Sequence, residues 1–440
     1  MNAIIGIGRE EKNIWERRVP LIPAHVGELV REHGLDIRVQ TSPIRIFPDR
    51  DFQREGARIV NDLTSCAIVF AIKEIPIHVL EKGKVYLFFT HTTKGQSHNM
   101  PMLKKMVDLG CTVIDYEKIV NEKGQRLLFF GRQAGEAGMI ETLWSLGQRL
   151  NVEGKKNNPF LEIRQTHTYP SLAAAKEDIQ KVGSHIRSRG LDPSLVPLVC
   201  GFTGYGHVSQ GAQEIFELLP SEEIQPDALG AFFKAKKFSA NRLYKVVFKE
   251  SDMVRPKTRE VAFVLQDYYD HPEKYEPVFD SYVPYLTILV NCIFWSPKYP
   301  KYVTKEFLKR LYGGPTAPRL RVIGDITCDI NGSMECTIKA TEPDVPSFVY
   351  DPFQDVARDG FTGNGPVVMA VDNLPAEIPL ESSVFFSGAL KSFVPGIAAA
   401  DFSGRLADCR LPDPIRRALI LFRGQFTPEY EYMKDFIKSL

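Results

Sequence analysis

The chain lacks the features of a membrane, nucleic-acid-binding or disulfide-rich protein. Its 440 residues hold no apolar stretch near the roughly 18 residues that span a bilayer, and its formal net charge of +1 gives no attraction to nucleic acid. Seven cysteines are scattered without a C-x-x-C pair, so neither a disulfide framework nor a zinc site is predicted. The N-terminus lacks the basic segment of a signal peptide. These absences predict a cytoplasmic, metal-free protein with small-molecule partners, without nucleic-acid or membrane partners, and compatible with a homo-oligomer.

Short apolar segments that end on an ionisable side chain are the most informative pattern present. Continuous apolar runs separated by helical stretches are typical of parallel strands buried on both faces. Segments 66–72, 84–90, 111–114 and 127–130 run into Lys73, His91, Glu117 and Arg132. Because ligands bind at the carboxyl ends of such strands, these charges are expected to gather at a substrate site. The pattern predicts an α/β protein with two Rossmann-like domains, parallel sheets and an interdomain cleft.

The length and the order of the elements predict two domains. Residues 1–135 together with 376–440 are expected to form a substrate domain, and residues 136–375 a dinucleotide-binding domain. A long helix over 135–151 would join them. The helices predicted from periodicity are Ala24–Glu32, Asp51–Val60, Asn99–Leu109, 135–151, Leu172–Arg189, Glu381–Ala400 and Pro414–Leu440.

A glycine-rich turn follows the apolar segment 196–202. It reads Gly204-Tyr-Gly206-His-Val-Ser209 and precedes an amphipathic stretch. The first glycine allows a tight turn, and the second lets the backbone approach a pyrophosphate at a helix N-terminus. A strand–helix turn without a ligand is the alternative. An acidic residue that hydrogen-bonds the ribose is expected about 20 residues after the glycine turn, at the end of the next strand. Segment 221–225 at this place is a poor strand candidate. Both NAD and NADP therefore remain open as cofactors.

The groups after the first-domain strands suit acid–base chemistry. An amine near other cations loses its proton more readily, and a histidine titrates near neutrality. Lys73 and His91 are therefore candidate acid–base residues, with Glu117 beside them, and Arg18 is a candidate fork for a substrate carboxylate. Taken singly, Lys73 is more easily read as a surface lysine and His91 as a core histidine. Their shared topology favours the functional interpretation.

Several strings resemble a known family. Glu16-Arg-Arg-Val-Pro-Leu-Ile-Pro23 is similar to the opening of the alanine dehydrogenase and pyridine nucleotide transhydrogenase family. More narrowly, the chain resembles the lysine–ketoglutarate reductase half of aminoadipic semialdehyde synthase and, more distantly, the lysine-forming saccharopine dehydrogenases. The strings that carry this resemblance lie at 88–94, 114–118, 134–140, 202–213 and 371–375.

The resemblance implies that the chain condenses L-lysine with 2-oxoglutarate and reduces the imine with NADPH or NADH to give saccharopine, or runs the reverse reaction. It implies catalytic roles for Lys73 and His91, tuned by Glu117. The residues that it places at substrate are Arg18, Lys94 and Phe130. Arg132 stands where relatives often carry an uncharged residue, and is either a local substitution or an extra substrate contact. Those that it places at the dinucleotide are Gly204, Gly206, His207, Val208, Arg126, Asp325 and Thr327. Gln225 stands where an acid is expected, which mildly favours NADP.

Two other functions stay open from the residues. The same imine chemistry could act on another pair, such as ornithine or pyruvate. A dinucleotide- or amino-acid-sensing module without turnover is the second alternative, and the retained Lys73, His91 and Glu117 argue against it.

Overall fold

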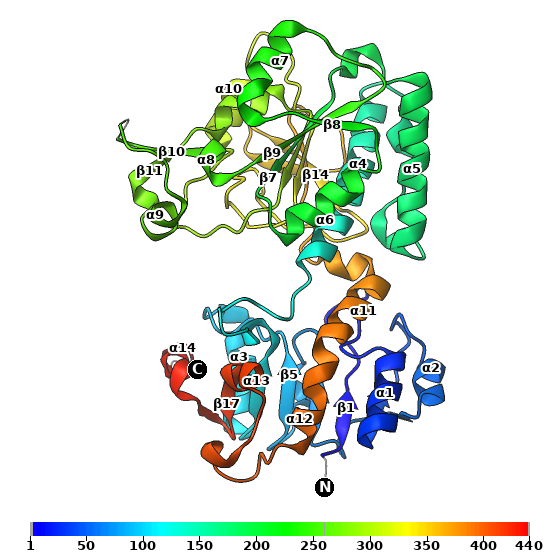
Figure 1. Cartoon of the computed structure of the whole chain (residues 1–440), viewed down its shortest axis with the longest axis vertical. Coiled ribbons are helices and arrows are strands. Elements are labelled where there is room, and N and C mark those ends of the chain that lie inside the picture. Colours follow the sequence, from blue (N-terminus) through cyan, green and yellow to red (C-terminus); the bar gives the residue numbers. More distant parts are fainter. Residues whose placement is uncertain (1–2, 259, 439–440) are drawn as a thin grey trace. The chain divides into compact units, whose positions relative to one another are not determined.

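The structure is a computed structural model that describes residues 3–258 and 260–438. The chain divides into two compact units. The terminal unit comprises Met1–Phe130 and Pro379–Leu440, and the central unit comprises Gly131–Ile378. Figure 1 shows that blue N-terminal and orange-to-red C-terminal segments build the terminal unit together.

The terminal unit contains an eight-stranded sheet in the order β18-β17-β6-β5-β4-β1-β2-β3. Its strands are β1 (Ile5–Ile7), β2 (Ile37–Gln40), β3 (Arg58–Val60), β4 (Ile68–Phe70), β5 (Val85–Phe88), β6 (Thr112–Asp115), β17 (Leu419–Phe422) and β18 (Gln425–Phe426). Strands β1 to β6 are parallel, and β17 pairs with β6 in the antiparallel sense. The central strands are buried along their whole length, which explains their uninterrupted apolar sequences.

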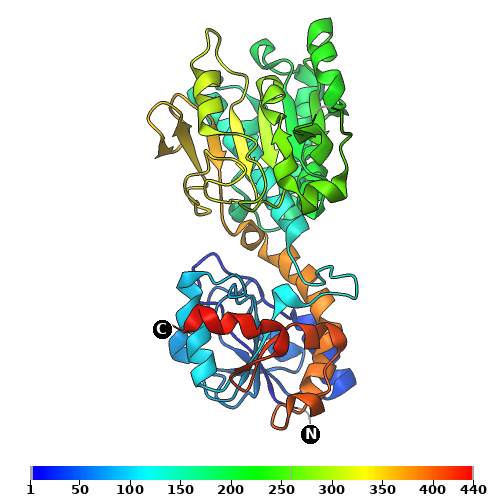
Figure 2. The same cartoon turned by 90° about the vertical axis from the view of Figure 1, so that its left-hand side faces the viewer.

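Helices from both ends of the chain cover this sheet. They are α1 (Pro23–His33), α2 (Asp49–Arg54), α3 (Met100–Asp108), α11 (Pro379–Leu390), α12 (Val394–Ala399), α13 (Asp413–Arg417) and α14 (Lys434–Ile437). The backbone N–H groups of Val19 and Ile22 donate to hydroxyls of Ser383 and Ser387 on α11, at 3.0 and 2.9 Å. Figure 2 shows the red C-terminal segment beside the light-blue α3, which α14 contacts.

Three local predictions in this unit are wrong. The helix expected over Asp51–Val60 ends at Arg54, because Gly56 adopts φ +92° and Arg58–Val60 pairs as the edge strand β3. The tail beyond residue 414 contains strands β17 and β18, since its apolar run completes the sheet beside β6. Segment 127–130 is irregular, with Leu128 buried in the core and Leu127 and Phe130 packed against it. A four-residue apolar run does not distinguish such a segment from a buried strand.

The central unit contains a second eight-stranded sheet, in the order β15-β14-β16-β13-β12-β7-β9-β8. Its strands are β7 (Val199–Thr203), β8 (Ser221–Glu223), β9 (Leu243–Phe248), β12 (Ile288–Asn291), β13 (Val322–Asp325), β14 (Ser347–Asp351), β15 (Val356–Asp359) and β16 (Val367–Met369). Strand β14 alone runs against the others, and it pairs with β16 and with β15 in the antiparallel sense, whereas every other pair is parallel. A separate hairpin pairs β10 (Val254–Pro256) with β11 (Tyr275–Pro277).

Helices cover both faces of the central sheet. Those of the central unit are α4 (Gly131–Val152), α5 (Leu172–Arg189), α6 (His207–Phe216), α7 (Leu229–Ala235), α8 (Glu250–Met253), α9 (Leu265–Asp270) and α10 (Lys305–Tyr312). Figure 1 shows α4, α5 and α6 on one side of the sheet and α7 and α10 on the other. Two separate hydrophobic cores correspond to these two faces. The predicted bounds of α5 are confirmed, and α4 begins four residues before its predicted start.

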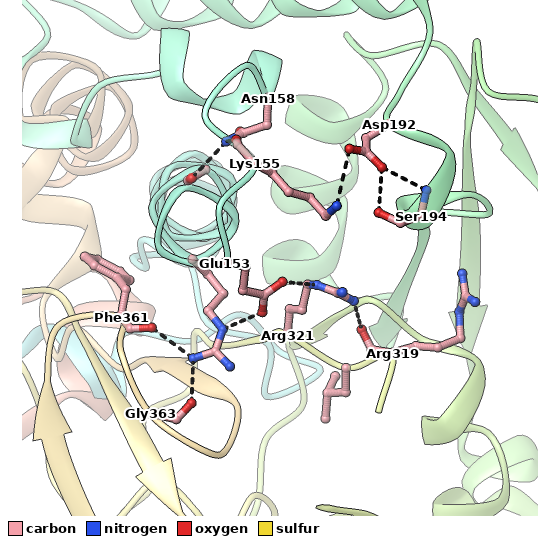
Figure 3. Close-up of polar contacts among 12 residues, drawn as sticks. Glu153, Lys155, Asn158, Asp192, Ser194, Arg319, Arg321, Phe361 and Gly363 are labelled. Atoms are coloured by element: carbon pink, nitrogen blue, oxygen red, sulfur yellow. Dashed lines mark hydrogen bonds and ion pairs between the residues drawn. The ribbon is translucent and has the colours of Figure 1, made fainter. Parts of the chain in front are cut away.

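A polar cluster closes the central sheet at the end where β13 begins. Glu153 accepts hydrogen bonds from Arg149 at 2.8 Å and from Arg321 at 2.9 Å. Arg149 also donates to the carbonyl oxygens of Phe361 and Gly363, at 2.9 and 3.1 Å (Figure 3). These contacts tie the end of α4 to the loops that precede β13 and β16. The cluster lies at the amino ends of the parallel strands, whereas the glycine turn follows β7 and lies at their carboxyl ends.

Candidate active site

Four adjacent strands of the terminal unit end on ionisable side chains. Glu10 follows β1, Lys73 follows β4, His91 follows β5 and Glu117 follows β6. These strands are neighbours in one parallel sheet, so their carboxyl ends meet at one edge. A cavity of about 260 Å³ at this unit is lined by Glu10, Lys73 and Glu74, among others.

Glu74 joins His91 and Lys12 at this edge. The Nδ1 atom of His91 lies 2.5 Å from Oε1 of Glu74, and Nζ of Lys12 lies 3.5 Å from Oε2. Burial alone would raise the pKa of Glu74, but the hydrogen bond and charge of His91, with the charge of Lys12, lower it to about 2. Glu74 is therefore a carboxylate at neutral pH. Sequence reasoning missed it, although it directly follows Lys73.

The backbone of His91 adopts φ +48°. This left-handed conformation is uncommon for residues other than glycine, although histidine tolerates it better than most. Strained backbone of this kind gathers at functional sites, where the surrounding structure holds it. In this conformation the ring of His91 contacts Glu74, so the turn after β5 positions the imidazole.

The amine of Lys73 is poised to lose its proton. Burial is the largest cause that lowers its pKa, and the nearby cations of Arg18 and Lys12 lower it further, to about 8. Glu16 and Glu74 oppose this shift without cancelling it. The charges of Arg18, Lys12, Glu16 and Glu74 thus all act on the amine of Lys73.

Arg18 is held in a buried pocket. Its Nε and one terminal nitrogen donate to the two oxygens of Glu16, at 2.7 and 2.6 Å. The guanidinium carbon lies 4.4 Å from the ring centroid of Phe130, and that ring stacks on Phe386 at 4.9 Å. A bidentate ion pair and a cation–π contact together fix the orientation of the guanidinium. Phe130 is thereby part of the same cluster as Arg18.

Glu10 clamps the strand end that carries Lys73. Its two carboxylate oxygens accept from the backbone N–H groups of Ile72 and Lys73, at 2.6 and 3.0 Å. Burial and the charge of Glu16 raise the pKa of Glu10. The sequence contained no signal for this contact, because 62 residues separate Glu10 from Ile72.

Glu117 and Lys94 follow strands β6 and β5 of the same sheet. The carboxylate of Glu117 forms an ion pair with Arg126, which belongs to the terminal unit and is exposed. Lys94 lies in an exposed turn after β5. The carboxylate in direct contact with His91 is therefore Glu74, and Glu117 lies at the end of the next strand.

The glycine turn of the central unit has the geometry of a phosphate-binding loop. Gly204 adopts φ +78°, and its N–H donates to the carbonyl of Phe248 at 2.8 Å. A Cβ atom at Gly206 would meet nothing within 4 Å, so open space lies over the start of α6. His207 is exposed on the first turn of that helix, and Val208 packs against Gly135 of α4. An anion is favoured at such a helix N-terminus.

A second cavity, of about 450 Å³, opens beside this turn. Apart from Glu250, its lining is apolar, aromatic or glycine. The lining residues are Gly204, Tyr205, Gly206, Glu250, Met253, Tyr268, Tyr269, Cys292, Ile293, Phe294, Tyr299 and Tyr302. A pocket of this size and lining can hold part of a dinucleotide.

Asp325 anchors a buried network behind the turn. Its carboxylate accepts from Asn291 at 2.8 Å, from Thr337 at 2.5 Å and from Thr327 at 3.0 Å. Asn291 in turn accepts from Thr203 at the end of β7, at 2.9 Å. The network holds the ends of β7, β12 and β13 in place. Thr327 is partly exposed, whereas Asp325 is buried.

Arg132 belongs to the central unit. It lies exposed on the first turn of α4 and forms ion pairs with Glu214 of α6 and with Glu136, the second at 3.9 Å. Its guanidinium therefore braces two helices of that unit.

Among residues 3–258 and 260–438, no group of three or more His, Cys, Asp or Glu side chains is arranged to hold a metal ion. No helix in the described part of the chain has the length and apolar character to cross a bilayer.

Known proteins are similar to this chain along its whole length. Residues 6–137 match the alanine dehydrogenase/PNT N-terminal domain. The chain is 39% identical to the alpha-aminoadipic semialdehyde synthase of Arabidopsis thaliana, in an alignment that covers 100% of this chain and 42% of the relative. It is 32% identical to the mitochondrial enzyme of that name from Mus musculus, over 99% of this chain and 48% of the relative. The chain is therefore similar to one part of the alpha-aminoadipic semialdehyde synthases. The resemblance inferred from the motifs is thus confirmed.

The chain spans less than half the length of these synthases. It is also 26% identical to the saccharopine dehydrogenase (NAD(+), L-lysine-forming) of Neurospora crassa, over 86% of this chain and 87% of the relative. Among solved structures, an L-alanine dehydrogenase has a TM-score of 0.61 at 17% identity, covering 98% of this chain and 99% of that chain. The transhydrogenase of Sinorhizobium meliloti has a TM-score of 0.54 at 14% identity, covering 97% and 99%. The predicted α/β class with two mostly parallel sheets is confirmed.

Proposed function

We propose that the chain is an NAD(P)H-dependent oxidoreductase that condenses L-lysine with 2-oxoglutarate to form saccharopine, or catalyses the reverse. The supporting observation is the cluster at one sheet edge of the terminal unit, where Lys73, whose pKa is lowered, precedes Glu74, and Glu74 is hydrogen-bonded to His91. The terminal unit would bind the substrates and the central unit the dinucleotide. The names of the homologues agree with this chemistry.

The cluster supplies two proton carriers of different kinds. Neutral Lys73 would take a proton from the substrate ammonium so that the amine can attack the keto carbon. His91, whose Nδ1 is bonded to Glu74, would donate a proton from Nε2 to the departing hydroxyl of the carbinolamine. Arg18 would orient a substrate carboxylate. Loss of water gives the imine.

The remaining predicted residues keep their proposed roles around these groups. Lys94, Phe130 and Arg132 would contact or frame substrate, and Glu117 would tune the local charge. On the dinucleotide side the proposed residues are Gly204, Gly206, His207, Val208, Arg126, Asp325 and Thr327. NADH or NADPH, when bound, supplies the hydride that reduces the imine carbon.

Mixing the protein with lysine, 2-oxoglutarate and either NADH or NADPH tests the proposal. Absorbance of the reduced nicotinamide should fall, and saccharopine should form in equal amount. Omission of either substrate should abolish the signal. A panel with ornithine as amine and pyruvate as keto acid separates the lysine reaction from related imine reductions. No oxidation with either nucleotide would reject the proposal.

Replacement of Gly206, in the glycine turn, and of Gly211, in α6, by alanine should affect nucleotide binding and stability differently. A Cβ at Gly211 would lie 2.1 Å from the carbonyl oxygen of Arg132, so Gly211→Ala should force α6 from α4 and cost about 1–3 kcal/mol of unfolding free energy. Gly206→Ala meets no protein atom and should keep its stability, but its methyl group would occupy space that a pyrophosphate needs. We expect its dinucleotide affinity to fall by about tenfold or more, or about 1.4 kcal/mol. Denaturant unfolding and nucleotide titration of both variants measure these effects. Tight binding by Gly206→Ala would contradict the assignment.

A further inference from the structure

The His91 turn, residues 90–95 after β5, contains two residues with left-handed backbone. His91 adopts φ +48° and Gly95 adopts φ +71°. Left-handed backbone at a residue other than glycine is uncommon and persists only where the surrounding contacts hold it. The contacts made by this turn therefore decide whether the ring of His91 stays against Glu74.

Neighbouring elements hold the first half of the His91 turn. The hydroxyl of Thr90 lies 2.7 Å from that of Thr92 and donates to the carboxylate of Asp115, at the end of β6, at 2.7 Å. The side chain of Asn99 donates to the carbonyl of His91 at 3.3 Å. These contacts fix residues 90–92, and a distant part of the chain contacts residues 93–95.

The C-terminal strap, residues 428–438 (red in Figure 2), contacts the second half of the turn. The hydroxyl of Tyr432 donates to the carbonyl of Thr93 at 3.0 Å, across 339 positions of sequence. The ring of Phe436 covers Gly95, where an added Cβ atom would lie 3.1 Å from it. The rings of Tyr432 and Phe436 meet edge to face, with 5.8 Å between their centroids. Two aromatic side chains of the strap thus brace the turn together.

Other residues anchor the strap to the terminal unit. The hydroxyl of Thr427, directly before the strap, donates to a carbonyl of β17 at 2.6 Å, and that of Tyr430 donates to the carbonyl of Arg417 at 2.8 Å. Met433 is fully buried, whereas Tyr432 is 47% exposed. The strap therefore docks through its own anchors, and the hydrogen bond of Tyr432 adds a contact to the turn.

We propose that Tyr432 is a positioning residue for the proposed reaction, because its hydrogen bond to Thr93 keeps the His91 turn in the conformation in which the imidazole contacts Glu74. The inference rests on the proposed function, which gives His91 its role as proton donor. Tyr432 contacts the backbone of the turn and so acts through His91. A small displacement of a reacting group lowers the rate although the group itself is unchanged.

Tyr432→Phe tests the inference, with Tyr430→Phe as its matched control. Each variant keeps the ring and loses one hydrogen bond from a phenol of the strap to a backbone carbonyl. We expect Tyr432→Phe to lower kcat about threefold to tenfold, in keeping with one neutral hydrogen bond, and to leave the KM values of lysine and 2-oxoglutarate nearly unchanged. Tyr430→Phe should keep the wild-type kcat. Steady-state oxidation of NADH or NADPH by the full chain measures both variants.

The ring of His91 gives a second readout that does not depend on turnover. In protein that contains isotope-labelled histidine, the NMR signal of this imidazole is identified by its absence from His91→Gln. Without substrates, we expect the signal to move in Tyr432→Phe and to keep its wild-type position in Tyr430→Phe. A role of Tyr432 in stability alone would lower the temperature of unfolding and leave the His91 signal in place.

The two readouts separate the inference from the proposed function. In an active chain, a wild-type kcat in Tyr432→Phe overturns the inference, and so does an unmoved His91 signal. An equal loss of kcat in Tyr430→Phe also overturns it, because the loss then follows from the stability of the strap. If the wild-type chain oxidises neither nucleotide, the proposed function fails and the His91 signal decides alone. Movement in Tyr432→Phe only then supports the hold of Tyr432 on the turn, and movement in both variants or in neither overturns it.

Discussion

Replacement of Lys73 by Met, or of His91 by Gln, is expected to lower kcat at pH 7 by about 10²- to 10⁴-fold, the usual contribution of a positioned acid or base. The expectation follows from the geometry of the terminal unit. Lys73 is half-buried near the cations of Arg18 and Lys12, and His91 is oriented by Glu74 at 2.5 Å. Steady-state cofactor oxidation with lysine and 2-oxoglutarate measures the effect.

The pH profile should carry the signature of Lys73. Burial and neighbouring cations lower its pKa from 10.5 to about 8, so the neutral amine becomes the main form above about pH 8. If this amine is the base, log kcat/KM should rise by about one per pH unit below pH 8 and level off above it. The rising limb should disappear in Lys73→Met.

Measurement of the free energy of unfolding distinguishes a loss of catalysis from a loss of folding in these variants. The folded-state pKa of Lys73 is depressed, so at pH 7 its charge opposes folding, and Lys73→Met should not lower the free energy of unfolding. Lys82→Met and His98→Gln alter exposed side chains of the same unit and are the matched controls. If both Lys73→Met and His91→Gln keep the wild-type kcat, neither residue is the acid or base of the reaction.

Glu16→Ala is expected to lower the free energy of unfolding by about 3–5 kcal/mol, the typical cost of breaking a buried ion pair by removing one partner. The side chains of Glu16 and Arg18 are 0% and 1% exposed. The variant removes both short hydrogen bonds that Arg18 makes to this carboxylate, while the guanidinium stays out of water. Urea unfolding at neutral pH, followed by circular dichroism, measures the change.

A surface ion pair provides the comparison for Glu16. Glu306 pairs with Arg310 on α10 at 2.9 Å, with side chains 82% and 60% exposed. Exposed pairs of this kind contribute about 0.3–0.5 kcal/mol, so Glu306→Ala should change stability little. A loss below about 1 kcal/mol in Glu16→Ala would show that the Arg18 pocket relaxes or admits water.

Much of the fold follows from local sequence. Uninterrupted apolar runs identified β4, β5 and β6, because strands buried on both faces need apolar side chains at every position. Helical periodicity identified α5 within its observed bounds. The strand, glycine turn and helix at residues 199–216 were predictable because the φ of +78° at Gly204 favours glycine.

The sequence alone therefore determined which residues end the buried strands, and so the identities of Lys73, His91 and the glycine turn. Only the tertiary structure decided their partners. Glu74 reaches His91, Glu10 reaches the backbone of Lys73, and Glu16 faces Arg18, because side-chain contacts depend on packing and not on periodicity. Likewise, only the pairing of β9 with β7 brings Glu250 to the cavity that Gly204 and Gly206 line. Strand order in a parallel sheet is set by long-range pairing, which a linear pattern does not encode.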